Sequence, residues 1–137
     1  MEIKVNGKWY ELSWFDDFEE IEMIGEIEET KDIPDCIDLE SDWDTVQEYL
    51  GLSEYDQQIV LAYYKATNVF NPEEAQEAFV GNYTDGAEFA DSLAYELGSI
   101  PDDLPEWIAY HIDWQAVWDA ELRHDYFEVD GLYFRNL

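Results

Sequence analysis

The sequence is poor in basic residues and in the features that stabilise secreted or membrane proteins. Six Lys and Arg stand against 35 Asp and Glu, so the 137 residues carry a formal net charge of −29. Binding to DNA, RNA or an anionic membrane needs basic patches, and this composition disfavours all three partners. The single cysteine, Cys36, excludes an intrachain disulfide, and no run of 18 apolar residues can form a membrane-spanning helix. The N-terminus lacks the apolar stretch of a signal peptide, so we expect a cytoplasmic protein.

The hydrophobic content is high for so acidic a chain. Acidic tails are usually disordered, because self-repulsion is strong and little surface can be buried. This chain is 47% hydrophobic and 17% aromatic, and aromatic side chains dominate core energetics. We therefore expect a packed domain covered with carboxylates, whose partner has a basic groove. Duplex DNA carries one charge per about 1.7 Å, so the net charge equals that of about 15 base pairs. Solubility or salt adaptation is the simpler alternative.

Turn and capping signals predict an α+β fold with an elongated, mostly helical, acidic core. Asn6-Gly7 predicts an N-terminal β-hairpin, and Asp130-Gly131 predicts a C-terminal one. Between them we expect a short amphipathic helix in FDDFEEIE, a strand at 24–30 and a connection at 31–42. Helices capped by Ser41, Ser53, Asn71, Asp85 and Asp113 are expected at about 41–50, 54–67, 71–79, 86–97 and 114–123, with a short helical turn at 104–108. We divide the chain into a small β-containing region, 1–40, and a helical core ending in a hairpin, 41–137.

No motif in the sequence favours an enzyme, a metal site or a cofactor. The alternating acids that begin at Asp38 suggest a calcium loop, but Trp43 and Tyr49 stand where that loop needs Gly and Glu. His111 and His124 lack the spacing of zinc ligands. Pairs of carboxylates could act as a hydrolase acid and base; with 35 acids, however, such pairs arise by chance.

Four aromatic residues of the C-terminal third have two explanations. They are Trp107, Tyr110, Trp114 and Trp118. Packing in the core is the default explanation. Any that remain exposed would indicate a protein–protein interface, such as a homodimer seam.

Several segments, in order, resemble the ArdA antirestriction family. They are LSEYDQQIVLAYY at 52–64, EEAQEAFVGNY at 73–83, EFADSLAYELG at 88–98, LPEWIAYHIDW at 104–114 and DYFEVDGLYF at 125–134. The family shows a similar F-x-G-x-Y turn, a helix with an F-A pair, and a closing D-Y-F…D-G…F segment. Residues 1–40 match only faintly, and the chain is shorter than typical members.

This resemblance implies the function of a DNA-mimicking inhibitor. Family members are acidic homodimers of phages, plasmids and transposons that act in the bacterial host cell. Their carboxylates imitate DNA phosphates and occupy the DNA groove of type I restriction–modification enzymes. The implied partners are the DNA-binding subunits of such an enzyme, or a CRISPR effector if a compact variant has changed its target. An acidic module that binds a basic host protein is the alternative from another class.

The candidate phosphate mimics are carboxylates on predicted helices. No single one should be essential, because the binding energy is spread over many screened charge pairs. The candidates are Asp16, Asp17, Glu19, Glu20, Glu73, Glu74, Glu77, Glu88, Asp91, Glu96, Asp119 and Glu121.

Overall fold

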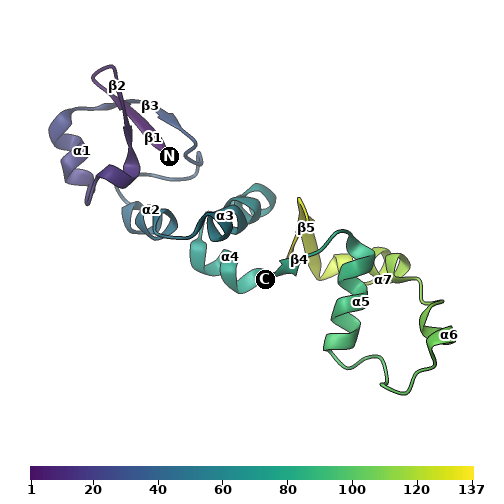
Figure 1. Ribbon diagram of the computed structural model, residues 1–137. Helices are drawn as coiled ribbons and strands as arrows, with labels where there is room; N and C mark the ends of the chain where they lie inside the picture. The colour runs from purple at the N-terminus through teal and green to yellow at the C-terminus, as the bar shows by residue number, and fades with distance from the viewer. The chain divides into compact units, whose positions relative to one another are not determined.

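The computed structural model describes residues 1–137 and divides them into two compact units, Met1–Gln76 and Glu77–Leu137. Seven α-helices and two three-stranded antiparallel sheets confirm the α+β prediction (Figure 1). Acidic residues dominate both units, with 21 acidic against 4 basic residues in the first and 14 against 2 in the second. None of the helices has the length and apolar character needed to cross a bilayer.

The first sheet is formed by β1 (Glu2–Val5), β2 (Lys8–Glu11) and β3 (Ile27–Lys31), with β1 in the centre. The predicted N-terminal hairpin is confirmed. Asn6 and Gly7 both have positive φ, 54° and 78°, as the two central residues of a type I′ turn require. The strand expected at 24–30 is β3, which pairs antiparallel with β1.

A hydrophobic core joins this sheet to the helices on either side of the connection at 32–42. The core contains Ile3 and Val5 of β1, Ile21 of α1 (Phe18–Ile24), and Trp43 and Val46 of α2 (Trp43–Leu50). A short 3-10 helix, η1 (Leu12–Trp14), links β2 to the α1 segment. The division after residue 40 stays a prediction; in the structure, residues on both sides of it share this core.

The other helices of this region follow their capping signals. Ser53 caps α3 (Glu54–Thr67) by accepting a hydrogen bond from the Asp56 backbone N–H. Asn71 likewise caps α4 (Pro72–Ala78) through the Glu74 N–H. The prediction that Ser41 caps α2 was wrong. The helix begins one residue later, with Asp42 at the N-cap, and the Asp42 carboxylate accepts instead from the Asp38 N–H at 2.9 Å.

The second sheet contains β4 (Phe79–Asn82), β6 (Leu132–Arg135) and β5 (Tyr126–Val129), in that order. The hairpin of β5 and β6 confirms the Asp130-Gly131 prediction, and both turn residues have positive φ. β4 was not predicted; a helix was expected to reach Phe79. The α4 helix ends at Ala78, and the chain passes directly into the strand.

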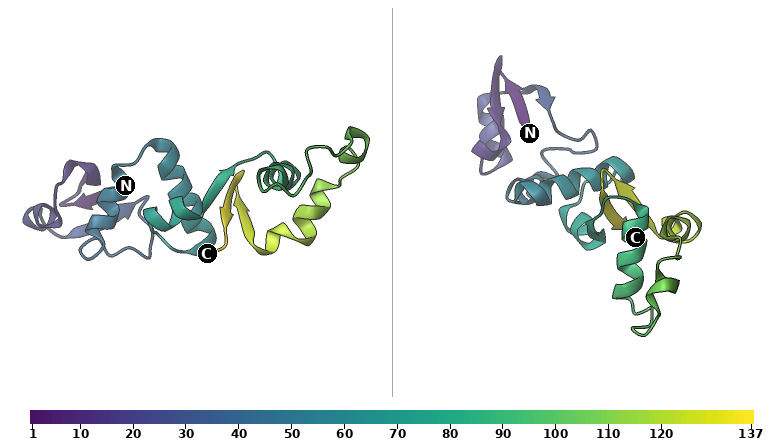
Figure 2. Two further views of the ribbon diagram at one scale, coloured as in Figure 1. Left: turned by 90° about the horizontal axis from the view of Figure 1, so that it is seen from below. Right: turned by 45° about the vertical axis from the view of Figure 1, so that its right-hand side comes forward.

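The helices of the second unit are α5 (Gly86–Glu96), α6 (Glu106–Ala109) and α7 (Trp114–Ala120), followed by the 3-10 helix η2 (Leu122–His124). Both views in Figure 2 show α6 as a short helix within the long segment that joins α5 to α7. The predicted helix at 114–123 is interrupted, because Glu121 leaves helical geometry with φ −121° and ψ −62°.

A cluster of aromatic rings forms the core of this unit. Phe89 of α5 stacks on Tyr133 of β6 with ring centroids 4.8 Å apart. Trp118 of α7 meets both rings edge-on, at 5.6 Å and 5.3 Å. Phe89 is fully buried and Tyr133 is 3% exposed. Aromatic pairs in these geometries add stability beyond their buried area, so these ring contacts stabilise the packing of α5 and α7 against the sheet.

Candidate partner-binding surface

The twelve candidate carboxylates all reach the surface. No charged or polar residue is buried anywhere in the structure. Of the twelve, Glu20, Glu74 and Asp91 are half-buried and the other nine are exposed. Because the interior of each unit is hydrophobic, the acidic side chains of both units remain accessible to a binding partner.

The first group lies at the start of α1, where hydrogen bonds fix its backbone. The Asp17 carboxylate accepts from the Glu20 N–H at 3.0 Å, and the Glu20 carboxylate accepts from the Asp16 N–H at 3.2 Å. The Trp43 indole of α2 donates to the Asp16 carbonyl at 3.2 Å. The carboxylates of Asp17 and Glu20 therefore stabilise the N-terminal end of α1 by accepting backbone hydrogen bonds. The exposed carboxylates of Asp16 and Glu19 take no part in this network.

The second group lies on α4. Glu73 and Glu77 are exposed and are spaced i, i+4, which places them on the same face of a helix. Glu73 and Glu74 lie in the first turn, where negative charge complements the helix dipole. The acids of α4 therefore stabilise their own helix and also present negative charge at the surface.

The third group, on α5, repeats the capping arrangement of α1. The Asp85 carboxylate accepts from the Glu88 N–H at 2.8 Å, and the Glu88 carboxylate accepts from the Thr84 N–H at 2.8 Å. The hydrogen bonds from Thr84 lower the pKa of Glu88, because they favour the charged carboxylate. Glu96, by contrast, is exposed at the last residue of the helix, where the dipole disfavours a negative charge. Glu96 therefore has no helix-capping role that would account for a carboxylate at this position.

The three α5 acids do not form one continuous stripe along their helix. Glu88 and Asp91 are three residues apart and share a helix stripe, whereas Asp91 and Glu96 are five apart and do not. Asp119 of α7 accepts a hydrogen bond from the Gln115 side chain at 3.2 Å. Glu121 follows the end of α7 instead of lying on the predicted helix. Of these candidate acids, Glu88 and Asp91 alone share a helix stripe.

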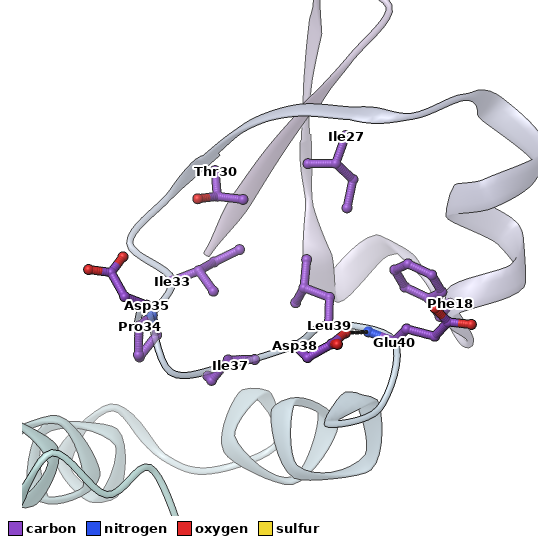
Figure 3. A pocket seen from close by; sticks show the side chains of 10 residues that line it. All are labelled: Phe18, Ile27, Thr30, Ile33, Pro34, Asp35, Ile37, Asp38, Leu39 and Glu40. Atoms are coloured by element: carbon purple, nitrogen blue, oxygen red, sulfur yellow. Dashed lines mark hydrogen bonds between the residues drawn. The ribbon is translucent and has the colours of Figure 1, made fainter.

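The first unit also contains an open pocket of about 390 Å³ (Figure 3). Apolar side chains line it, among them Phe18, Ile27 and Leu39, together with acidic residues of the connection at 32–42. The Asp38 carboxylate accepts from the Glu40 N–H at 3.0 Å. Asp38 and Glu40 are exposed to solvent at the rim of this pocket.

Two titratable groups of the second unit, Glu88 and Tyr133, have shifted pKa values. The pKa of Glu88 is lowered, which is opposite to the requirement for a general acid. Burial raises the pKa of Tyr133 to about 12, with a smaller contribution from the negative charges of Glu128, Asp85 and Glu88. Tyr133 belongs to the aromatic core. No group of three or more His, Cys, Asp or Glu residues has an arrangement that could hold a metal ion.

The structure corrects the default prediction for the four aromatic residues. Trp118 packs in the core as expected and Trp114 is half-buried, but Trp107 and Tyr110 are 70% and 80% exposed. Both lie at α6, in which no residue is buried. The sequence feature that could have indicated this exposure is the shortness of α6. A single helical turn that follows Pro101 and Pro105 has few neighbouring residues that could cover its aromatic rings.

A family model described as "Antirestriction protein (ArdA)" matches residues 1–135. The match includes residues 1–40, which the motif comparison related to that family only faintly. Neither the curated proteins nor the solved structures contain a match to this chain.

Proposed function

Because this chain belongs to the ArdA antirestriction family, we propose that it inhibits a type I restriction–modification enzyme by occupying the groove in which that enzyme binds DNA. The supporting observation is the placement of charge. With 35 acidic residues, none of them buried, the protein presents dense negative charge on a folded scaffold. Such a surface suits the Lys and Arg side chains that hold DNA phosphates.

The proposed inhibition needs no catalysis and no cofactor. Exposed carboxylates pair with the basic residues of the enzyme, and the opposite charges of the two proteins accelerate their encounter. Capping fixes the backbones that carry Asp17, Glu20 and Glu88, so part of the mimic surface is ordered before binding. Preorganisation of this kind lowers the entropic cost of association.

We further propose that the protein acts as a homodimer in the cytoplasm of a bacterial host. Exposed apolar side chains of the first unit, such as Trp14 at 65% and Met23 at 86% exposure, support a self-association surface. Two copies would double the length of duplex that the charge can imitate. Sedimentation of the purified protein measures the oligomeric state directly, and a monomer at micromolar concentration would contradict the dimer.

The decisive experiment is competition for DNA. The protein is titrated into a type I methyltransferase core holding fluorescently labelled duplex, at a low and a high salt concentration. We expect displacement of the duplex, and we expect the displacement to weaken as salt rises, because salt screens the charge pairs. No displacement at either concentration would contradict the proposed target. Displacement of DNA from a CRISPR effector instead would retain the mimicry and change the enzyme.

Substitutions then test which carboxylates matter. Glu73→Ala alone should change inhibition less than about fivefold, since an exposed charge pair contributes about 1 kcal/mol or less. Simultaneous reversal of Glu73, Glu77 and Asp119 to Lys should abolish inhibition. The matched control reverses the exposed acids Glu28, Asp44 and Glu54, which are outside the candidate set, and has the same net charge. Equal losses in the two triple variants would show that total charge, and not position, determines inhibition.

A further inference from the structure

Two exposed aromatic rings at α6 form a small surface of their own. Trp107 and Tyr110 are spaced i, i+3, which places them on the same side of the helical turn. The Tyr110 N–H donates to the Glu106 carbonyl at 2.9 Å, so the turn is formed up to Tyr110. Trp107 is 70% and Tyr110 is 80% exposed. We call these two residues the α6 aromatic face.

The surroundings of the α6 aromatic face carry one sign of charge. Glu106 precedes Tyr110 by four residues and so lies beside it on the turn. Asp102 and Asp103 lie in the preceding connection and are exposed. No Lys or Arg occurs from residue 66 to residue 122. The neighbouring negative charges therefore have no basic residue nearby in the sequence to neutralise them.

An aromatic ring beside a carboxylate has the chemistry that recognises arginine. The guanidinium group stacks on the face of Trp or Tyr, and its N–H donors bind a carboxylate in the same plane. A second copy of this chain is a poor partner for the α6 aromatic face. Its own Asp102, Asp103 and Glu106 would lie opposite the same three acids of the first copy. Like charges placed together across an interface oppose association. Charge complementarity thus selects an arginine-bearing partner over self-association.

We propose that the α6 aromatic face anchors an arginine side chain on the DNA-binding surface of the target enzyme. This inference rests on the proposed function and adds a component that phosphate mimicry does not supply. Carboxylate pairs weaken as salt screens them. Stacking of a guanidinium on an indole buries apolar surface as well as charge, so the anchor maintains affinity at salt concentrations where the carboxylate pairs are weak.

The test measures how affinity depends on salt. The full-length double variant Trp107→Ala/Tyr110→Ala and the wild type compete for labelled DNA on the same methyltransferase core at several salt concentrations. We expect the variant to bind about tenfold more weakly at every concentration, with the slope of log affinity against log salt unchanged. The reversal variant at Glu73, Glu77 and Asp119 should instead flatten that slope. Trp107→Phe should recover part of the loss, because a ring is retained.

Leu97→Ala is the matched control, since Leu97 is 68% exposed in the same unit and has no aromatic ring. It should bind like the wild type. Equal affinity of the double variant and the wild type would overturn the anchor alone. Failure of the wild type to displace DNA would overturn the proposed function and the anchor with it. A double variant that dissociates from dimer to monomer in sedimentation would also overturn the anchor, because a second copy would then be the occupant.

Discussion

Gly86, the first residue of α5, has a role that follows from one neighbouring side chain. An added Cβ at this position would overlap the indole ring of Trp118. Alanine is the better helix former by about 1 kcal/mol, so helix propensity alone predicts that Gly86→Ala stabilises the protein. We expect the opposite, a loss of about 1–3 kcal/mol in the free energy of unfolding, because the rigid indole lies in the aromatic core and must shift. Urea unfolding followed by tryptophan fluorescence measures this loss.

Gly51→Ala provides the comparison for that substitution. Gly51 has φ −80°, and an added Cβ would meet backbone oxygen atoms at ordinary contact distance, the nearest being the Gln47 carbonyl at 3.5 Å. We expect this variant to unfold at the wild-type urea concentration or slightly above it. Stabilisation by both substitutions would mean that the Trp118 indole can move aside with no loss of stability. The packing of α5 against α7 would then be looser than the ring contacts indicate.

Helix α5 links a capping carboxylate to the acid stability of the second unit. The pKa of Glu88 is lowered by its hydrogen bonds from Thr84. A lowered pKa in the folded state means that this stabilisation is present above the ordinary carboxyl pKa and is lost as pH falls through the lowered value. Glu88→Gln keeps an acceptor but does not titrate. We therefore expect the wild type to be the more stable at pH 6, and its advantage to shrink by pH 3, in thermal unfolding measured across this range.

Glu96→Gln is the control at the other end of the same helix. Its substitution removes a negative charge from the C-terminal end of the helix, where the dipole disfavours it. This variant should therefore be slightly more stable than the wild type at pH 6. The same sign of effect at Glu88 and Glu96 would show that general charge repulsion, and not the capping hydrogen bond, determines how α5 responds to pH.

Elements with local signals were predictable from the sequence. Asn6-Gly7 and Asp130-Gly131 favour positive φ at adjacent residues, and both hairpins formed around them. Ser53 capped the helix it was expected to cap. β4 was missed because no turn residue separates α4 from Phe79. It was also missed because this strand forms by pairing with β6, from Phe79 with Phe134 to Asn82 with Leu132, far along the sequence. Register with a distant strand is not encoded in the local pattern.

The candidate site was predictable in composition and not in arrangement. Acidic side chains were certain to reach the surface, because burial of unpaired charge is prohibitive. Their grouping depends on helix bounds: Glu121 lies off α7 because the helix ends at Ala120. The exposure of Trp107 was predicted least well. A tryptophan is usually packed in a core, and only the fold of the connection between α5 and α7 shows that this one is not.

Across the whole chain, the net charge opposes folding and promotes binding. Charges of one sign repel within the compact state, and the 21 and 14 acidic residues of the two units have only 4 and 2 basic residues to offset them. The buried cores must overcome that repulsion in each unit separately. Salt should therefore act on stability and on affinity in opposite directions.

We expect the melting temperature to rise by a few degrees when NaCl increases from about 10 mM to about 100 mM. The Debye length falls over that interval from about 30 Å to about 10 Å, which screens repulsion between distant carboxylates. Differential scanning calorimetry measures the rise, and a variant with Glu28, Asp44 and Glu54 changed to Gln should show a smaller one. A melting temperature that falls with salt would mean that short ion pairs, such as Lys31 with Glu2 at 3.6 Å, outweigh the long-range repulsion. The charge of this protein would then stabilise its fold as well as its complex.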